Sequence, residues 1–225
     1  MGTMWNLQGL NILIVEDEFL LADDLASYVA EAGANVLGPS PSLGHAANYL
    51  SRADAAVLDV NLNGCPVFPL ADDLIKLGVP FVFFTGSDDF ELPSRFIHLN
   101  FLRKPASRQK LIGAMLGRDL LETDAKGQQR RQVGRQGNAR TMPRHEASVA
   151  EIMLLLPRLR LAARVMTGGE ETGDHLVAQT LERAIAEAAG KPWEVPLLDW
   201  LNRIMDECLG SRLHMGGDAC GRQSH

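Results

Sequence analysis

Short runs of consecutive apolar residues alternate with segments of helical periodicity through the first 121 residues of the chain. The runs are rich in Val, Ile, Leu and Phe, which is typical of strands buried on both faces of a parallel sheet. The predicted strands are residues 11–15, 35–38, 55–59, 81–85 and 99–102. Helices are predicted at residues 19–30, 43–50, 68–77 and 107–121. This order predicts a five-stranded parallel α/β sheet with helices on both faces.

One segment breaks the alternation. Residues 86–98 contain Pro93 and show little clean periodicity. We therefore expect a loop or one irregular helical turn where a regular fourth helix would otherwise lie.

The rest of the chain has a different composition. Residues 122–144 carry six basic and two acidic side chains and almost no large apolar ones, which is typical of a flexible linker. Helical spacing returns beyond it, so an all-helical block is expected, with Pro157 marking a kink or restart in its first helix. The predicted helices of this block are residues 149–166, 174–189 and 197–209.

These patterns predict two folded domains with a linker and a tail. We expect an α/β domain at residues 1–121, a basic flexible linker at 122–144, a helical domain at 145–212 and a flexible tail at 213–225. The whole chain has a net charge of −6, and both expected domains are acidic, so neither has the overall charge of a DNA-binding protein. The alternative for the linker is nonspecific phosphate contact through its arginines, which salt would weaken steeply.

Composition also bears on the compartment. No stretch of about 18 uncharged apolar residues exists, which excludes a simple membrane span. The first ten residues lack the pattern of a secretory signal. The three cysteines are too scattered for a disulfide framework, so a cytoplasmic protein is expected.

Acidic side chains follow two of the predicted strands. Glu16 and Asp17 come directly after the first strand, and Asp59 ends the third. Because the carboxyl ends of parallel strands meet at one edge of the sheet, these three carboxylates are expected to lie together. They would repel one another without a cation, and hard oxygen ligands with room for water suit Mg²⁺.

The same edge carries further groups for phosphoryl chemistry. A carboxylate such as Asp59 can act as a nucleophile towards a phosphoryl group and form an aspartyl phosphate. Thr85 ends the fourth strand and offers a hydroxyl, while Lys104 follows the fifth strand and offers a mobile positive charge. The alternative is that Asp17 and Asp59 are merely solvated carboxylates at loop starts.

Four segments in this order resemble the receiver domain of two-component response regulators. They are ILIVEDE (12–18), VLDVNLNG (57–64), FFTG (83–86) and LRKP (102–105), and the resemblance covers residues 9–121. It implies a flavodoxin-like (CheY-like) fold. It also implies a phosphoacceptor at Asp59 and a metal site formed by Glu16, Asp17, Asp59 and Asn61, the last through its backbone carbonyl. Thr85, Lys104 and Phe101 match the switch hydroxyl, the phosphate-pairing lysine and the aromatic switch position.

The helical block is similar to region 2 of bacterial sigma factors. The resemblance lies in residues 155–187 and 197–205, through Leu176, Val177 and Thr180 and then Trp200, Leu201 and Ile204. His175, Ala178 and Gln179 depart from the polar pattern that contacts RNA polymerase, and no helix-turn-helix follows. The resemblance therefore implies a sigma mimic that binds an anti-sigma factor or another transcription-control protein.

We therefore expect a phosphorelay response regulator with a sensor histidine kinase as phosphodonor. Phosphorylation at Asp59 would control the helical output module, and no enzymatic activity beyond this autocatalytic transfer is expected. One alternative is that residues 149–209 form a constitutive helical bundle for homodimerisation. The other is a Mg²⁺-dependent aspartyl phosphotransferase, although no large insertion near Asp17 or Asp59 supplies a substrate cap.

Overall fold

A parallel sheet of five strands forms the N-terminal half of the molecule. The computed structural model describes residues 5–86, 92–96, 99, 101–118, 122–123, 129–130, 149–192 and 194–215. The strands of the sheet are β1 (Asn11–Val15), β2 (Asn35–Ser40), β3 (Ala55–Asp59), β6 (Phe81–Thr85) and β7 (Phe101–Arg103). Their order is β2-β1-β3-β6-β7, and every neighbouring pair is parallel. This confirms the predicted flavodoxin-like topology.

Helices cover both faces of this sheet. They are α1 (Phe19–Glu31), α2 (Leu43–Ala47), α3 (Phe68–Leu77) and α4 (Arg108–Met115), with short 3₁₀ helices η1 (Leu50–Arg52) and η2 (Ser94–Phe96). Alternate residues of β1 point to opposite faces: Ile12 and Ile14 pack in one apolar cluster with α1 and α4, whereas Leu13 and Val15 pack in a second with α2 and α3. The sheet is therefore buried on both sides, as the continuous apolar runs predict.

Several predicted boundaries are wrong by a few residues. The fifth strand begins at Phe101, two residues later than predicted, and α2 ends at Ala47 before a separate 3₁₀ turn. The helix predicted at residues 107–121 ends at Met115, because Gly117 adopts a left-handed conformation (φ 66°) that an α-helix does not continue. Residues 119–121 lie outside the described part.

The irregular segment after β6 is held by aromatic packing. In the described part of residues 86–98 the only helical element is η2, so a regular helix is absent from that part. Phe96 of η2 is fully buried and stacks on Phe68 of α3 (centroids 5.6 Å apart). Arg95 lies over the Phe96 ring and pairs with Asp72 through two hydrogen bonds of 2.9 and 3.0 Å. The single turn η2 agrees with the predicted irregular helical turn, and the burial of Phe96 holds it in place.

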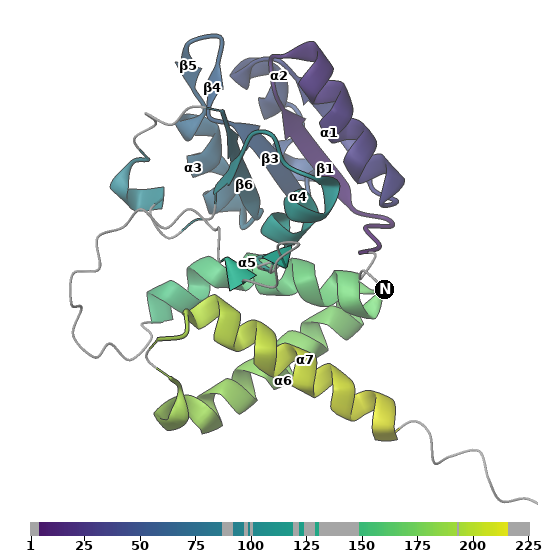
Figure 1. Ribbon diagram of the computed structural model, residues 1–225, viewed down its shortest axis with the longest axis vertical. Coiled ribbons are helices and arrows are strands. Elements are labelled where there is room, and N and C mark those ends of the chain that lie inside the picture. The colour runs from purple at the N-terminus through teal and green to yellow at the C-terminus, as the bar shows by residue number, and fades with distance from the viewer. Residues whose placement is uncertain are drawn as a thin grey trace, which may run out of the picture.

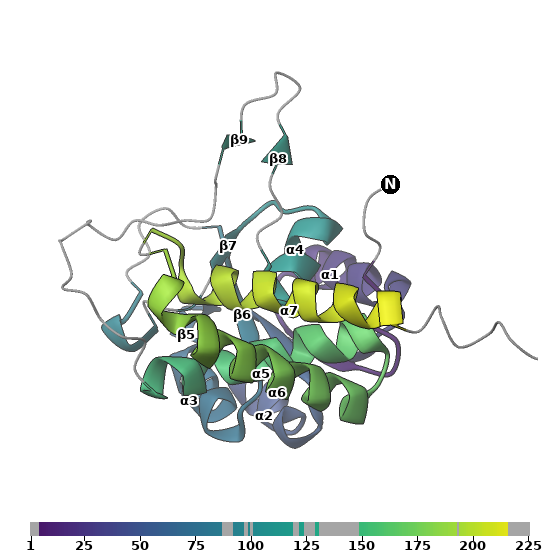
Figure 2. The same ribbon diagram turned by 90° about the horizontal axis from the view of Figure 1, so that it is seen from below.

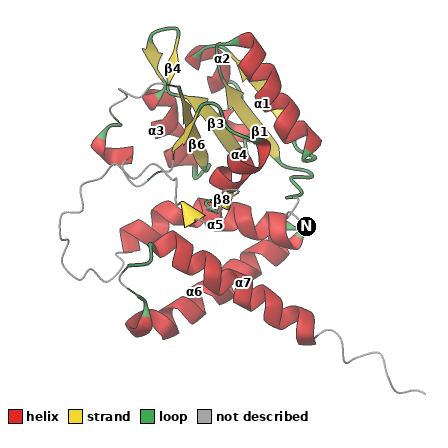
Figure 3. Ribbon diagram, in the orientation of Figure 1, coloured by secondary structure: helices red, strands yellow, loops and turns green. Residues whose placement is uncertain are grey.

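Three long helices form the C-terminal half of the molecule. They are α5 (Val149–Thr167), α6 (Glu170–Glu187) and α7 (Leu197–Met215), with the 3₁₀ helix η3 (Ala188–Gly190) between the last two. Of the kink or restart predicted at Pro157, the restart is wrong, since α5 continues through that residue. The chain is helical as far as Met215, so helix α7 is longer than predicted. Figure 3 shows α5, α6 and α7 on one side of the molecule, and the five-stranded sheet with its own helices on the other.

The predicted linker falls mostly outside the described residues. Its described part contains two short strands, β8 (Glu122–Thr123) and β9 (Gln129–Arg130), which pair antiparallel. The predicted flexibility of this segment and of the tail therefore stays a prediction.

The helical half packs against the sheet at the edge opposite the carboxyl ends of the strands. Helix α5 lies directly under the sheet, and α6 and α7 lie beyond it (Figures 1 and 2). One apolar cluster runs without interruption from Leu25 and Met115 of the N-terminal domain to Leu161 and Trp200 of the helices. The two halves therefore share a core. Among the described residues, no helix is both long enough and apolar enough to cross a membrane.

Candidate phosphoryl-acceptor site

Three carboxylates meet at the carboxyl edge of the sheet, as predicted. Glu16 and Asp17 follow β1, and Asp59 is the last residue of the adjacent strand β3. Each offers an oxygen atom, and these atoms lie within 4.8 Å of one another. The Glu16 side chain is 1% exposed and that of Asp59 is 12% exposed, so little water screens their repulsion.

Lys104 supplies the positive charge of this group. Its Nζ donates hydrogen bonds to Glu16 Oε2 at 2.7 Å and to Asp59 Oδ2 at 2.9 Å. The ammonium also lies 5.4 Å from the centroid of the Phe84 ring, which forms an apolar floor beneath it. The lysine is held in place because β7 pairs with β6, and the Lys104 amide donates to the Thr85 carbonyl at 2.8 Å.

Burial and charge shift the proton affinities of this pair. Burial raises the pKa of Glu16 from 4.5 to about 7, and the negative charge of Asp59 adds to this rise, while Lys104 opposes it. For Lys104, burial alone would lower the pKa, but the hydrogen bonds that its ammonium donates to Glu16 and Asp59, together with their negative charges, outweigh burial and raise the pKa above the ordinary lysine value. One lysine therefore does not neutralise the three acids.

A small hairpin beside β3 completes the site. Strands β4 (Asn61–Leu62) and β5 (Cys65–Pro66) pair antiparallel around a two-residue turn of Asn63 and Gly64. Both turn residues have positive φ values, 52° and 85°, which is the conformation that Asn-Gly favours in hairpins. The Asn61 amide donates to Asp59 Oδ1 at 3.3 Å.

Sequence reasoning missed the role of Asn63. Its backbone amide donates to Asp17 Oδ2 at 2.8 Å and so fixes the orientation of that carboxylate. The Asn-Gly dipeptide was the available signal, because it predicts a tight turn that folds the chain back towards the strand ends.

The two predicted switch residues lie on neighbouring strands. Asp59 lies opposite Phe84 in the sheet register, and Thr85 is the residue directly after Phe84. Thr85 is buried (5% exposed). Phe101 is opposite Phe83 at the start of β7 and packs at the edge of the apolar cluster formed with α2 and α3. The structure thus brings together Glu16, Asp17, Asp59, Thr85 and Lys104, with Asn61 and Phe101 at the margin.

The oxygen-rich group fits a hard divalent cation. All the side-chain donors are carboxylates, Asp17 is partly open to solvent, and the Lys104 ammonium already pairs with two of the three acids. A carboxylate set with room for water is the chemistry that Mg²⁺ prefers. Glu16, Asp17 and Asp59 would hold the ion through side-chain oxygens, with Asn61 as the predicted backbone ligand.

Strand order and strand-end residues define the N-terminal domain as receiver-like. The solution structure of SdrG from Sphingomonas melonis Fr1 is 35% identical over 48% of this chain and 96% of that one, with a TM-score of 0.43. The signal receiver domain of a modulated diguanylate cyclase from Desulfovibrio desulfuricans G20 is 27% identical over 47% of this chain and 90% of that one (TM-score 0.43). The non-phosphorylated HemR receiver domain from Leptospira biflexa is 25% identical over 47% and 90% (TM-score 0.41).

The helical domain matches a model of a known protein family. Residues 152–205 match the family described as the Sigma2 domain of PhyR. The N-terminal sheet has the flavodoxin-like strand order, and residues 152–205 are similar to a sigma2 domain, as predicted for the two parts of the chain. The comparison with curated proteins gave no match.

The sigma2-like residues divide between core and surface. Leu176, Val177 and Thr180 of α6 and Trp200, Leu201 and Ile204 of α7 are all buried. His175 and Ala178 are exposed on α6, where the sequence departs from the polymerase-binding pattern. The apolar positions thus form the core of the helical domain, whereas His175 and Ala178 lie on its surface.

Proposed function

We propose that this protein is a phosphorelay response regulator in which Mg²⁺-dependent phosphorylation of Asp59 controls a sigma2-like output domain. The observation that supports this most strongly is the group of Glu16, Asp17 and Asp59 with Lys104 at the carboxyl edge of a receiver-type sheet. It coexists in one chain with a match to the Sigma2 domain of PhyR.

The phosphoryl transfer is assigned to Asp59. A carboxylate oxygen of Asp59 forms a bond to phosphorus while the bond from phosphorus to the donor nitrogen or acyl oxygen breaks, and the leaving group departs with that electron pair. Lys104, now bound to Asp59 and Glu16, would pair with a phosphoryl oxygen. Thr85 would donate its hydroxyl to another. When bound, Mg²⁺ supplies charge neutralisation for the phosphoryl oxygens.

A sensor histidine kinase is the proposed phosphodonor. Phe19 and Leu20 begin α1 directly beside the acidic residues and are 81% and 72% exposed. Large apolar side chains this exposed next to a reactive site are suited to contact with a protein that must approach that site. Phosphorylation by such a kinase would place the protein in the cytoplasm.

The proposed output is binding of an anti-sigma factor or another transcription-control protein. The match to the Sigma2 domain of PhyR supports this partner class. The protein is proposed to act in transcription through that partner and to have no catalytic activity beyond its own phosphorylation.

Intact-mass spectrometry after incubation with acetyl phosphate tests the phosphoacceptor. We expect one phosphoryl adduct on the wild type, dependent on Mg²⁺ and removed at alkaline pH, and no adduct on Asp59→Asn. Asp73→Asn, which removes an exposed acid from α3, is the matched control and should accept the adduct like the wild type. Lack of an adduct on the wild type would contradict the proposal.

A pull-down with phosphorylated and unphosphorylated protein tests the output. A partner retained by one form and released by the other supports the proposed regulation. A constitutive dimer with no partner difference would instead favour the helical dimerisation alternative. Multiple turnover of a small phosphate ester would favour the aspartyl phosphotransferase.

A further inference from the structure

The Lys104 side chain crosses a phenylalanine between its own strand and the phosphoacceptor. In the order β3-β6-β7, strand β6 separates the strand that ends at Asp59 from the strand that leads to Lys104. Phe84, the fourth residue of β6, is opposite Asp59 on one side and opposite Leu102 of β7 on the other. Phe84 therefore lies between the phosphoacceptor and the strand from which the lysine extends.

All three side chains share one face of the sheet. Positions two apart on a strand point to the same face, and so do residues paired across a parallel sheet. Phe84 and Val57 belong to one apolar cluster, and Asp59 is two residues after Val57. Lys104 reaches Asp59 on this face, as the hydrogen bond of 2.9 Å between them shows.

The lysine bridges two strand spacings to make this bond. Neighbouring strands are about 4.8 Å apart, so β7 and β3 are separated by about 10 Å. The stem of Lys104 passes beside Gly86, since a Cβ built there would lie 3.7 Å from Lys104 Cδ. Its Nζ atom lies 5.4 Å from the centroid of the Phe84 ring. The ammonium is thus placed over the ring of the intervening strand.

The contact between ring and ammonium is largely shielded from water. Phe84 is 1% exposed, and the Lys104 side chain is 17% exposed. The face of an aromatic ring attracts a cation within about 6 Å of its centroid, and the attraction is larger when the pair is desolvated. Lys104 is therefore held by the ring as well as by its hydrogen bonds to Glu16 and Asp59.

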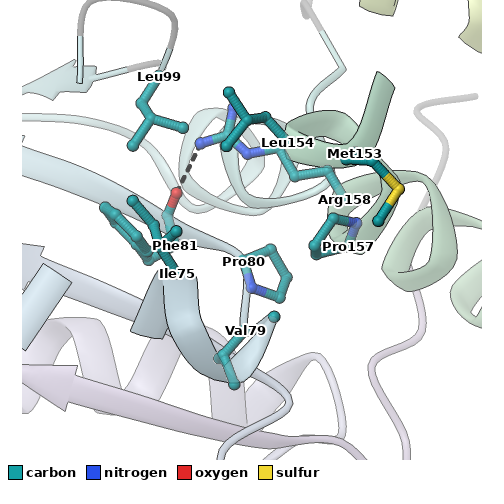
Figure 4. Close-up of a pocket in the computed structure, with 10 residues that line it drawn as sticks. Ile75, Val79, Pro80, Phe81, Leu99, Met153, Leu154, Pro157 and Arg158 are labelled. Atoms are coloured by element: carbon teal, nitrogen blue, oxygen red, sulfur yellow. Dashed lines mark hydrogen bonds between the residues drawn. The ribbon is translucent and has the colours of Figure 1, made fainter. Parts of the chain in front are cut away.

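Strand β6 gives the ring a fixed base. It is paired with β3 on one side and with β7 on the other. Its amino end is also held, because the Phe81 carbonyl accepts a hydrogen bond from Arg158 of α5 at 2.6 Å, in a notch of about 60 Å³ between the two domains (Figure 4). Phe81 and Phe83 pack in the cluster on the opposite face of the sheet. Of the three phenylalanines of β6, Phe84 alone shares the face of Lys104.

We propose that Phe84 is a positioning residue for Lys104, whose ring holds the ammonium beside Asp59 so that an arriving phosphoryl group meets a positive charge already in place. The ring attracts the ammonium without a directed bond, so Lys104 can turn from the carboxylate oxygens to a phosphoryl oxygen without leaving it. A charge already in place needs less reorganisation as the phosphoryl group is transferred. This inference rests on the proposed function.

Stepwise fluorination of Phe84 tests this role. Fluorine withdraws electron density from the face of the ring and weakens its attraction for a cation, while the ring stays apolar and nearly the same size. The full chain would carry phenylalanine, 4-fluorophenylalanine, 3,5-difluorophenylalanine or 3,4,5-trifluorophenylalanine at residue 84. Titration with beryllofluoride, a mimic of the phosphoryl group, in the presence of Mg²⁺ should show weaker binding with each added fluorine, by about two- to fivefold in total.

Affinity for Mg²⁺ alone separates positioning of the lysine from damage to the site. Lys104 and a divalent cation are attracted by the same carboxylates, so a lysine that is held less firmly does not weaken binding of the metal. We expect the trifluoro protein to bind Mg²⁺ as tightly as the wild type or more tightly. A distorted strand end would instead lower the affinities for Mg²⁺ and for beryllofluoride together.

Phe83 provides the matched control. It is adjacent to Phe84 in the same strand and fully buried, but it packs on the opposite face of the sheet. Trifluorophenylalanine at residue 83 should leave the affinity for beryllofluoride at the wild-type value. Phe84→Leu is the second variant, since it keeps an apolar side chain and removes the ring. It should weaken binding of beryllofluoride without weakening binding of Mg²⁺.

The outcomes separate this inference from the proposed function. Constant beryllofluoride affinity across the fluorinated series, beside normal binding by the wild type, would overturn the role of Phe84 and leave the proposed function intact. An equal loss from fluorination of Phe83, or a parallel loss of Mg²⁺ affinity, would also overturn it, because the effect would then not come from the contact with Lys104. Lack of beryllofluoride binding to the wild type would instead contradict the proposed function itself.

Discussion

Charge imbalance is the dominant property of the site at the scale of single residues. Lys104 bonds Glu16 and Asp59 at 2.7 and 2.9 Å, and Asp17 takes its hydrogen bond from the Asn63 amide. Three acids thus lie close to one ammonium that bonds only two of them, and burial raises the pKa of Glu16, the most buried acid, to about 7. A bound divalent cation would reduce the repulsion among these carboxylates.

The raised pKa of Glu16 predicts a loss of stability with rising pH. Between about pH 4.5 and pH 7 the unfolded chain has ionised this group while the folded chain still holds the proton, so the free energy of unfolding falls as pH rises. Urea unfolding in EDTA should show the wild type losing about 1–3 kcal/mol more than Glu16→Gln from pH 5 to pH 8. Parallel pH profiles for the two proteins would contradict the shift.

Residue types and spacing were enough to predict most of this site. Asp59, Asp17, Glu16 and Lys104 each follow a strand, and a parallel sheet has no other place for such residues than its carboxyl edge. Asn63 was not found, because its contribution is a backbone amide placed by a left-handed turn. The identity of a side chain carries little information about a backbone donor.

At the scale of elements, turns and close approaches decide where the site residues lie. The hairpin β4–β5 presents the Asn63 amide to Asp17, and in the described part of the segment after β6 the short turn η2 is anchored by Phe96. Both depend on local features, an Asn-Gly turn in the first and a buried phenylalanine in the second.

Gly64→Ala tests the hairpin. Nothing lies within 4 Å of the added Cβ, so only the positive φ of 85° opposes the substitution. We expect a loss of about 1–2 kcal/mol in stability, together with weaker Mg²⁺ binding as the Asn63 amide moves away from Asp17. Gly44→Ala is the control, because it also meets open space but lies within α2, where alanine should stabilise by up to about 1 kcal/mol. Equal effects of the two substitutions on chemical denaturation would contradict the account.

Gly173→Ala tests the packing of α5 against α6. Its Cβ would lie 2.9 Å from the Arg164 amide nitrogen and 3.1 Å from the Arg164 Cα, so the two helices would have to move apart. Overpacking of this kind costs about 1–3 kcal/mol. Gly210→Ala, within α7 and facing open space, gains the same helix propensity without a clash and should be neutral or stabilising in thermal unfolding. A stable Gly173→Ala protein would show that the helices are less closely packed than described.

The spacing of apolar residues predicted which segments form helices and strands, but it located the ends of several of them poorly. The strands at residues 11–15, 55–59 and 81–85 agree with the structure, because a run of four consecutive apolar residues between turn signals fits a buried strand. Helix α5 runs through Pro157, and α4 ends at Met115, two residues before the left-handed Gly117. Such ends depend on capping and on tertiary packing, which a periodic pattern does not contain.

At the scale of the whole molecule, the two domains are joined by a common core and by polar contacts. Arg158 donates to the Phe81 carbonyl and Arg164 pairs with Asp54; the Asn202 amide group donates to the Gly117 carbonyl at 2.9 Å, and Arg118 pairs with Asp206 at 2.9 Å. No sequence pattern predicted this docking. These four contacts join residues from 77 to 110 positions apart, and none of the residues departs from the pattern of its own element.

A shared core predicts cooperative unfolding of the unphosphorylated chain. Trp200 lies in the helical domain and Trp5 packs against the same cluster, so tryptophan fluorescence reports on the junction. Its urea transition should coincide with that of far-UV circular dichroism, which reports on both domains. Two separated transitions would show that the domains unfold independently.

Hydrogen exchange of α5 tests most directly the central claim that the state of Asp59 controls the helical domain. The amides of residues 152–167 should exchange at a different rate when the full chain is saturated with beryllofluoride and Mg²⁺ than when it is free, because control of the helical domain through Asp59 requires its contacts with the receiver to change. Asp59→Asn should show no such change under the same conditions. Unchanged protection of α5 in a wild-type chain that has bound the mimic would contradict the account.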